Sequence, residues 1–378
     1  MQKIKCDVLI IGGGCAGLSL AYEYAQMKSS KLSVCILEKR ESYYNDRTWC
    51  FWLGKQQNFS HRDIVSSSWR AWRFSSNNQS YVHHSENFSY CHIASLAFYK
   101  KITKVIGEDD RQTLLLEQDV TKIEKSGKYF SVEGPDLSVK ATNIIDTRAY
   151  GADEILEYTK IFQAFSGVEI ETNADFFDTD LVGLMDDIHS SGVKCQFRYL
   201  LPFTKRHALI EITSFSNIYI PPAELAASLQ LYLDNLKVSY KIIRKEQGVL
   251  PMGINHPPRS HDGIIMGGMK NDNLKPSSGY GFLRTQSWAK LVAMKLCSGD
   301  LDTGFEKVNH YIPKFFDDTF LRVLDDNINL TEEIFMGIGR NMNSDSFARF
   351  MSDQAQALDF IRLVAAVPKQ PFIKAAFS

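Results

Sequence analysis

Several features are scarce or missing in this sequence of 378 residues. Lysine and arginine number 43 and aspartate and glutamate 44, so the basic excess typical of nucleic-acid-binding proteins is absent. No apolar run approaches the roughly 20 residues that span a bilayer. An apolar strand pattern begins almost at once, which leaves no space for a signal peptide. We therefore expect a cytoplasmic protein that is soluble or lies on a membrane surface, without a nucleic-acid partner.

Cysteine usage excludes a disulfide framework. The seven cysteines are odd in number and include no Cys-x-x-Cys pair, and Cys6 and Cys35 fall in predicted buried strands. This pattern is typical of reduced thiols in a cytosolic protein. No metal-ligand spacing occurs either, because the neighbouring His83 and His84 lack a third ligand and resemble a surface pair. We expect neither disulfides nor a metal site.

The sequence does contain a glycine-rich turn between an apolar strand and a helix near its start. Residues 6–11 form the strand pattern, and Gly12, Gly14 and Gly17 follow as Gly-x-Gly-x-x-Gly. Glu38 ends a second apolar run about 20 residues later, where a dinucleotide fingerprint has its acid. The glycines permit a tight turn, close approach of a pyrophosphate and close packing of helix on strand. We expect the ADP part of a dinucleotide here, at the helix N-terminus.

The spacing of apolar residues changes along the chain and so divides it. Residues 92–107 and 223–236 repeat apolar side chains at helical spacing, whereas 196–203 and 208–213 are predicted to form a β-hairpin. A second glycine-rich stretch follows at 267–281. An antiparallel insert between two glycine-rich segments is commoner in FAD enzymes than in simple NAD dehydrogenases.

These patterns favour an α/β fold with an α+β insert. We expect a Rossmann-like FAD-binding domain with a parallel sheet, an inserted antiparallel β-sheet substrate domain and a mainly helical C-terminal region. The expected boundaries are 1–70, 90–155 and 250–300 for the discontinuous FAD-binding domain, 70–90 and 155–250 for the substrate domain, and 301–378 for the helical region.

Segments distributed over nearly the whole chain carry a resemblance to a known family. They are Leu-Glu-Lys-Arg at 37–40, Asp-Arg-Thr-Trp-Cys-Phe-Trp at 46–52, Asp-Thr-Arg at 146–148, Gln-Ala-Phe-Ser-Gly at 163–167, Leu-Met-Asp at 184–186, Tyr-Leu-Leu-Pro-Phe at 199–203, Ile-Glu-Ile-Thr at 210–213, Lys-Pro-Ser-Ser-Gly-Tyr-Gly-Phe at 275–282 and the tail at 367–376. In this order they resemble the lycopene cyclase family of FAD-dependent carotenoid enzymes. The segments at 199–213 and 275–282 are the most specific.

The resemblance implies a redox-neutral closure of linear carotenoid ends, such as those of lycopene, to β-ionone rings. An acid protonates the terminal double bond, an internal double bond attacks the carbocation, and a ring proton is lost. The resemblance also implies reduced FAD, NADPH or NADH as reductant, and peripheral contact with the membrane that dissolves the substrate. The number of ends cyclised, the choice between β and ε rings and the oligomeric state stay open.

The resemblance makes Glu211 the catalytic acid. On a strand, Ala208, Ile210 and Ile212 share one apolar face, so Glu211 on the other face is placed to line a pocket. A carboxyl against a hydrocarbon is desolvated, which raises its pKa and keeps its proton at neutral pH. Without the motif, a solvated glutamate on an exposed strand is the simpler interpretation. The family often carries a second acid directly after the first, and Ile212 stands there instead.

The same resemblance assigns the cofactor-binding residues. A helix beginning near Ser277–Gly279 is expected to point its N-terminus at the flavin pyrimidine edge and so favour the anionic reduced form. Trp49 and Trp52 either offer π-faces to the polyene and its carbocation or pack in the core. A polar stretch at 269–274, which the family usually lacks, precedes this motif. The expected cofactor-binding residues are Gly12, Gly14, Ala16, Gly17, Glu38, Lys39, Arg47, Thr48, Trp49, Asp146, Arg148, Gly267, Gly268, Pro276, Ser277, Ser278, Gly279 and Tyr280.

Two other functions stay open. An FAD- and NADPH-dependent monooxygenase or reductase acting on an isoprenoid would share the fold, but such enzymes usually carry Gly-Asp before the second flavin helix, and none stands near 262–282. A non-catalytic FAD-binding or carotenoid-carrier protein would not need Glu211. The candidates for membrane contact are Phe315, Phe316, Phe320, Phe372 and Phe377.

Overall fold

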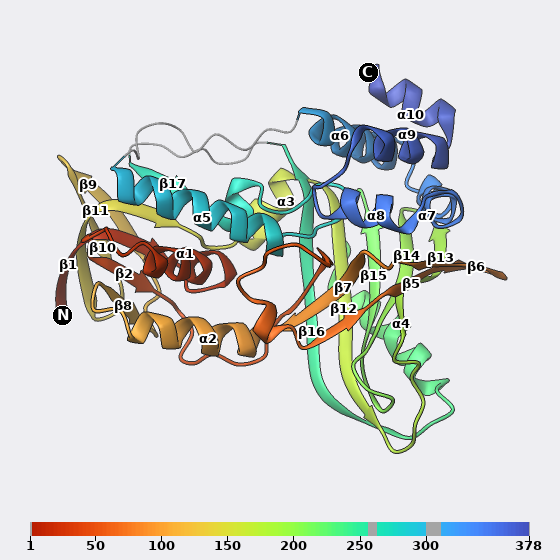
Figure 1. Cartoon of the computed structure of the whole chain (residues 1–378), viewed down its shortest axis with the longest axis horizontal. Coiled ribbons are helices and arrows are strands. Elements are labelled where there is room, and N and C mark those ends of the chain that lie inside the picture. Colours follow the sequence, from red (N-terminus) through yellow and green to blue (C-terminus); the bar gives the residue numbers. More distant parts are fainter. Residues whose placement is uncertain (1, 256–262, 300–310, 378) are drawn as a thin grey trace.

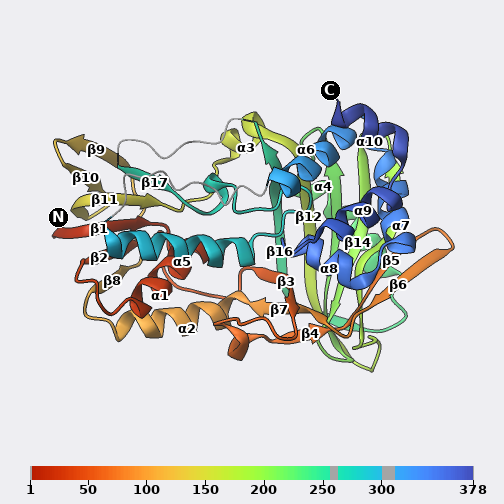
Figure 2. The same ribbon diagram turned by 45° about the horizontal axis from the view of Figure 1, so that its top comes forward.

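The computed structural model describes residues 2–255, 263–299 and 311–377. The molecule is elongated, with two halves side by side (Figure 1). One half holds a mainly parallel sheet with helices, and the other holds a large, mainly antiparallel sheet covered by the C-terminal helices (Figure 2). The predicted boundary at 300/301 lies outside the described residues.

The first sheet has a parallel centre. Strands β8, β2, β1 and β11 lie in that order and run parallel, and β17 continues this pattern beside β11. Residues 8–11 are buried, as expected of a parallel strand covered on both faces. The strands are β1 (Gln2–Ile11), β2 (Val34–Leu37), β8 (Gln112–Leu115), β9 (Lys122–Ser126), β10 (Tyr129–Glu133), β11 (Leu137–Asp146) and β17 (Ile264–Met266).

Each face of this sheet is covered by a different layer. Val8 and Ile10 pack with helices α1 (Cys15–Gln26), α2 (Ser95–Gly107) and α5 (Phe282–Ser298). Leu9 and Ile11 pack on the other face with side chains of the antiparallel β9–β10 ribbon. The alternation along β1 thus anchors the strand whose end leads into the glycine turn.

The second sheet is wide and mixed at one edge. Its strand order is β16-β12-β15-β14-β13-β5-β6, antiparallel except between β13 and β5. A small sheet, β3-β7-β4, links it to the first half. The strands are β3 (Thr48–Gly54), β4 (Ser67–Trp69), β5 (Ala71–Ser76), β6 (Gln79–His84), β7 (Phe88–Ala94), β12 (Thr159–Thr172), β13 (Leu181–Ser191), β14 (Lys194–Pro202), β15 (His207–Ser216) and β16 (Tyr240–Ile254).

The two faces of β15 lead to different layers. Ala208, Ile210 and Ile212 pack against α4 (Pro222–Asp234), whereas Leu209 joins the larger cluster beneath the C-terminal helices. The remaining helices are α3 (Ala152–Tyr158), α6 (Tyr311–Asp326), α7 (Leu330–Asn341), α8 (Ser344–Met351), α9 (Ala357–Ala366) and α10 (Lys369–Ala376). None of the helices in the described ranges is both long enough and apolar enough to cross a bilayer.

Local sequence patterns predicted several of these elements. The expected helices at 92–107 and 223–236 correspond to α2 and α4, and the expected hairpin corresponds to β14 and β15. Two expectations were wrong. The helix expected near Ser277–Gly279 begins only at Phe282, because Gly279 has a φ of +73°, which no α-helix accepts. His83 is buried, and its Nε2 lies 3.0 Å from the Gly339 carbonyl oxygen, so it is no surface residue.

Candidate active site

One elongated cavity of about 1070 Å³ extends from the glycine turn after β1 to the C-terminal helices. It passes between the small sheet, the inner face of the second sheet and helices α6 to α10. The part beneath these helices is lined largely by apolar side chains, among them Phe165, Phe197, Phe215, Phe316 and Phe335. The predicted site residues that line it are Gly12, Gly14, Ala16, Glu38, Lys39, Arg47, Thr48, Trp49, Arg148, Glu211, Gly268, Ser277, Ser278, Gly279 and Tyr280.

The other predicted residues do not line the cavity. They are Gly17, Asp146, Gly267 and Pro276. A Cβ on Gly17 would lie 2.0 Å from the Gly12 carbonyl oxygen, so this glycine permits the close approach of helix to turn. Asp146 accepts hydrogen bonds from Arg148, at 2.6 Å from Nη2, and so positions an arginine that does reach the cavity.

The glycine-turn end of the cavity suits a phosphate-bearing ligand. Helix α1 begins after Gly14, and no side chain caps the N-terminus of the helix. The N–H groups of the first turn of α1 are therefore available to a ligand in the cavity. Glu38 directly follows β2, and its Oε2 accepts the Gly13 N–H at 2.7 Å. Burial acts to raise the pKa of Glu38, but hydrogen bonds and charge from Arg40 outweigh it and lower that pKa. The carboxylate is therefore held ionised, as an acceptor for sugar hydroxyls must be.

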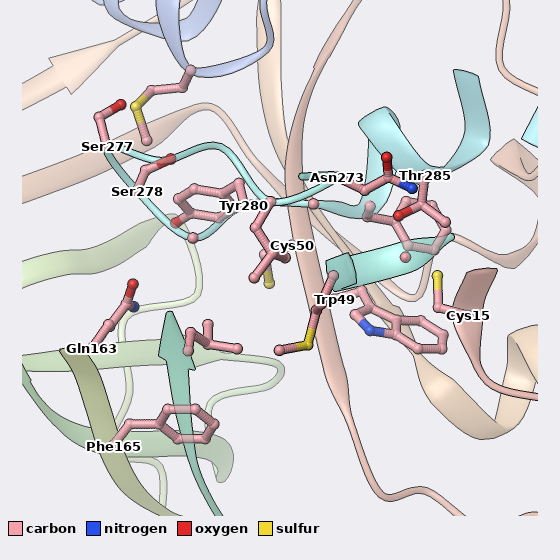
Figure 3. A pocket seen from close by; sticks show the side chains of 18 of the residues that line it. Cys15, Trp49, Cys50, Gln163, Phe165, Asn273, Ser277, Ser278, Tyr280 and Thr285 are labelled. Carbon is pink, nitrogen blue, oxygen red and sulfur yellow. The ribbon is translucent and has the colours of Figure 1, made fainter. Parts of the chain in front are cut away.

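The middle of the cavity contains buried polar atoms without a protein partner. Gln163 Oε1, Asn273 Nδ2 and Ser278 Oγ are buried, have no hydrogen-bond partner among the described residues and belong to residues that line the cavity, where Figure 3 shows their side chains. Unsatisfied buried groups are costly, so such atoms indicate a ligand with a complementary polar edge. The combination of one acceptor, one donor and one hydroxyl fits the alternating carbonyl and N–H groups of a flavin pyrimidine ring. The chain's own residues thus fit an FAD lying along the cavity.

Glu211 lies beyond this point, on the inner face of β15. Its side chain lines the cavity and neighbours Glu246 of β16, which approaches it across β12. Burial, and then the Glu246 carboxylate, raise the pKa of Glu211 well above its ordinary value, while Arg244 acts in the opposite direction. This arrangement favours the protonated form of a carboxyl group that faces an apolar cavity.

Aromatic side chains and the Cys50 thiol surround Glu211. The Tyr90 hydroxyl lies 2.6 Å from those of Tyr199 and Tyr280, and Tyr199 is the cross-strand neighbour of Glu211. Trp49 lines the cavity, but Trp52 is only 1% exposed and packs in the core against Tyr90. Of the two tryptophans considered, only Trp49 is placed to offer its ring to a ligand (Figure 3).

Sequence reasoning missed several lining residues. The most important are Glu246, Gln163 and Asn273, which come from β16, β12 and the loop before α5. Thr48 was expected to bind the cofactor, and it does line the cavity. Its hydroxyl, however, donates a hydrogen bond to Glu246 at 2.9 Å and accepts one from Arg244 at 2.8 Å. Among the residues that the structure describes, no group of three or more His, Cys, Asp or Glu side chains is arranged to hold a metal ion.

Comparison with known sequences gives one family. The model of the family described as "Lycopene cyclase protein" matches residues 7–377. The chain is 23% identical over 330 residues to a protein named neoxanthin synthase from Solanum lycopersicum, which covers 79% of this chain and 62% of that protein. It is 25% identical over 272 residues to a protein named lycopene beta-cyclase from a Paracoccus species, with 68% of each covered. The chain thus spans about three fifths of the plant relatives that it matches.

Comparison with solved structures gives the same fold class. A geranylgeranyl bacteriochlorophyll reductase-like protein from Thermoplasma acidophilum superposes with a TM-score of 0.64 at 13% identity, covering 99% of both chains. A flavin-dependent brominase superposes with a TM-score of 0.63 at 13% identity, covering 96% of this chain and 98% of its own. The predicted Rossmann-like α/β fold of FAD enzymes is therefore confirmed.

Proposed function

The chain belongs to the lycopene cyclase family, and from this premise we propose that it closes the ends of a linear carotenoid such as lycopene to β-ionone rings. The observation that carries the proposal is Glu211, a carboxyl with a strongly raised pKa that faces an apolar cavity. A hydrocarbon offers no polar handle, so a site that acts on it needs an apolar wall and a proton source. Both stand together on the inner face of the second sheet.

In the proposed reaction, Glu211 gives its proton to the terminal double bond of the bound polyene. An internal double bond then attacks the carbocation, which forms the ring, and a ring proton leaves. No electrons are gained or lost. The apolar walls hold the polyene in a folded conformation that brings the two double bonds together. They also exclude water, which would otherwise react with the carbocation. Trp49 lines the same cavity, but its ring packs against Phe98, Tyr99 and Phe282 of the first half, so we assign it no role at the carbocation.

We assign the cofactor as FAD in its reduced form, with NADPH or NADH as the reductant. Glu38 and the N-terminus of α1 would hold its ADP part, and Gln163, Asn273 and Ser278 would bind the polar edge of its ring. When bound, the reduced flavin supplies negative charge near the carbocation. The chain's residues set its position, and Glu211 remains the proton source.

The first test is the product. When the chain is produced in lycopene-accumulating bacteria, we expect a pigment isomeric with lycopene, because cyclisation adds and removes one proton. Chromatography with mass detection measures this directly. A product with added oxygen or hydrogen would contradict cyclisation and support the monooxygenase or reductase alternative, whose fold is shared. Unchanged lycopene together with bound FAD would support a carrier.

We further propose that the C-terminal helices contact a lipid bilayer around the cavity mouth. Helices α6, α9 and α10 lie together at one end of the molecule (Figures 1 and 2). These helices and Phe377, which directly follows α10, carry exposed apolar side chains, and four of these also line the cavity, namely Phe315, Val364, Ile373 and Phe377. The cavity therefore reaches the surface through an apolar rim, which suits the uptake of a substrate dissolved in lipid. Of the expected aromatic candidates, Phe316, Phe320 and Phe372 are not among the exposed large hydrophobic residues and line the cavity instead.

Serine substitutions at Ile373 and Phe377 of this rim and at the exposed Ile361 of α9 test the proposed membrane contact. We expect the triple variant Ile361→Ser, Ile373→Ser, Phe377→Ser to bind lipid vesicles at least roughly tenfold more weakly, because burying each apolar side chain contributes about 1.5–3 kcal/mol. Co-sedimentation with vesicles measures the effect. The matched control Leu231→Ser, Ile242→Ser, Ile243→Ser alters exposed apolar residues of α4 and β16 instead. Equal loss in both variants would contradict this docking face.

A further inference from the structure

The strand order of the second sheet brings two distant glutamates together. β12 lies between β15 and β16, and Gly167 of β12 pairs with Glu211 on one side and with Glu246 on the other. Residues that are directly opposite on neighbouring strands point to the same face. Both carboxyl groups therefore project into the cavity from either side of one glycine.

The absence of a side chain at Gly167 permits this meeting. A Cβ at this position would lie 2.6 Å from Cγ and 3.0 Å from Oε1 of Glu211. The Glu211 side chain thus lies over the bare backbone of β12, in the space that any other residue would occupy. From there it hydrogen-bonds the carboxyl of Glu246. Two carboxyl groups in hydrogen-bond contact share one proton, since both cannot ionise without strong repulsion.

The position of Glu246 is fixed by groups on four strands, β16, β3, β12 and β15. Arg244 Nη1 donates to Glu246 at 2.6 Å, and the Thr48 hydroxyl donates at 2.9 Å. Arg244 Nε also donates to Glu169 at 2.9 Å, and His207 Nε2 lies 2.7 Å from the second oxygen of Glu169. Arg244 therefore pairs with Glu246 as a carboxylate, which leaves the shared proton to Glu211.

The remaining titratable groups near the pair are neutral over the physiological range. They are Cys50 of β3, Tyr90 and His92 of β7, Tyr199 of β14 and Tyr280 before α5. Burial raises the pKa of Cys50 to about 12 and lowers that of His92 to about 4. The charge that Glu211 experiences from this surrounding comes mainly from Glu246 and Arg244.

We propose that Glu211 and Glu246 form one acid–base unit that holds a single proton, with Glu246 as the positioning residue. This inference rests on the proposed cyclisation. Glu211 gives the proton to the terminal carbon of the polyene, where a C–H bond forms. The C–H bond that breaks in the ring returns a proton to the pair, so proton count and electrons balance over one turnover. Between these steps the pair carries one more negative charge, which stabilises the carbocation beside it.

A pH profile of cyclisation tests the role of Glu246. Removing its negative charge lowers the pKa of Glu211, so Glu246→Gln is expected to lose activity on the alkaline side first. We expect the alkaline limb to move by roughly one pH unit or more, a tenfold change in the protonated fraction at a given pH. The control Glu171→Gln removes an exposed glutamate of β12 that pairs with Lys241. An unchanged limb in Glu246→Gln would overturn the proposal.

Infrared spectroscopy of the FAD-loaded protein tests the pair without turnover. We expect the carbonyl band of a protonated carboxyl that persists above neutral pH in the unaltered protein and is absent in Glu211→Gln. In Glu246→Gln, the midpoint of its loss moves to lower pH by roughly one unit or more. Equal midpoints would overturn the pair while leaving cyclisation intact. If the protein shows the expected band and its expected shift but forms no cyclic product, the proposed function is wrong and the proposed carboxyl pair still holds.

Discussion

Glu211→Gln is expected to lower cyclisation by roughly 10²–10⁴-fold, the usual contribution of a general acid. Glutamine has nearly the same shape and keeps a hydrogen bond to Glu246, but it holds no transferable proton. The sheet, the cavity walls and the cofactor-binding residues are expected to stay in place, because the substitution changes neither the size of the side chain nor any residue of the apolar clusters on either face of β15. Product formation in lycopene-accumulating cells, measured against the amount of FAD-loaded protein, gives the loss.

Two matched measurements keep this result interpretable. FAD content, read from the flavin absorbance of the purified variant, is expected to equal that of the unaltered protein. Glu171→Gln, an exposed glutamate on the neighbouring strand, is expected to cyclise normally. Substantial cyclisation by Glu211→Gln would assign the proton to another group. Loss of FAD in the same variant would mean that Glu211 acts on the cofactor rather than on the substrate.

The parts of the site that depend on neighbouring residues were predictable from the sequence. The conformation of the glycine turn and the start of α1 are determined by a few adjacent residues, since only glycine readily adopts the φ of +100° at Gly12. The alternation at 208–213 likewise predicted that Glu211 faces away from Ile210 and Ile212. The structure agrees, because those isoleucines pack against α4 while Glu211 lines the cavity. Local geometry leaves few alternatives in such segments.

The parts that depend on strand register were not predictable. Glu246 follows Glu211 by many residues, and only the pairing of both strands with β12 brings them together. A shift of one residue would turn Glu246 to the opposite face. Gln163 on β12 and Asn273 in the loop before α5 are far apart in the sequence, and only the folded chain brings both to the cavity. His83 was misplaced because its burial comes from α7, an element distant in the sequence.

Gly17→Ala is expected to weaken FAD binding by roughly fivefold to a hundredfold. Its Cβ would lie 2.0 Å from the Gly12 carbonyl oxygen, and neither atom belongs to a flexible side chain. Helix α1 must therefore move away from β1 or the turn must open, and overpacking of this kind costs about 1–3 kcal/mol. Either change moves the N-terminus of α1 from the position where the phosphates would bind. Titration of the FAD-free variant, followed by quenching of flavin fluorescence, measures the affinity.

The location of Gly17 makes this a test of the binding model rather than of a contact. Gly17 does not line the cavity, so its replacement removes no group that touches a ligand. If FAD is held by the helix terminus, moving that terminus must weaken binding although every lining side chain is intact. Gly107→Ala is the control, since in the described part of the chain the added Cβ would have no neighbour within 4 Å beyond its own helix backbone and adjacent residues. Normal FAD affinity in a correctly folded Gly17→Ala variant would mean that the phosphates bind elsewhere along the cavity. The expected order of ADP, flavin and Glu211 along the cavity would then be wrong as well.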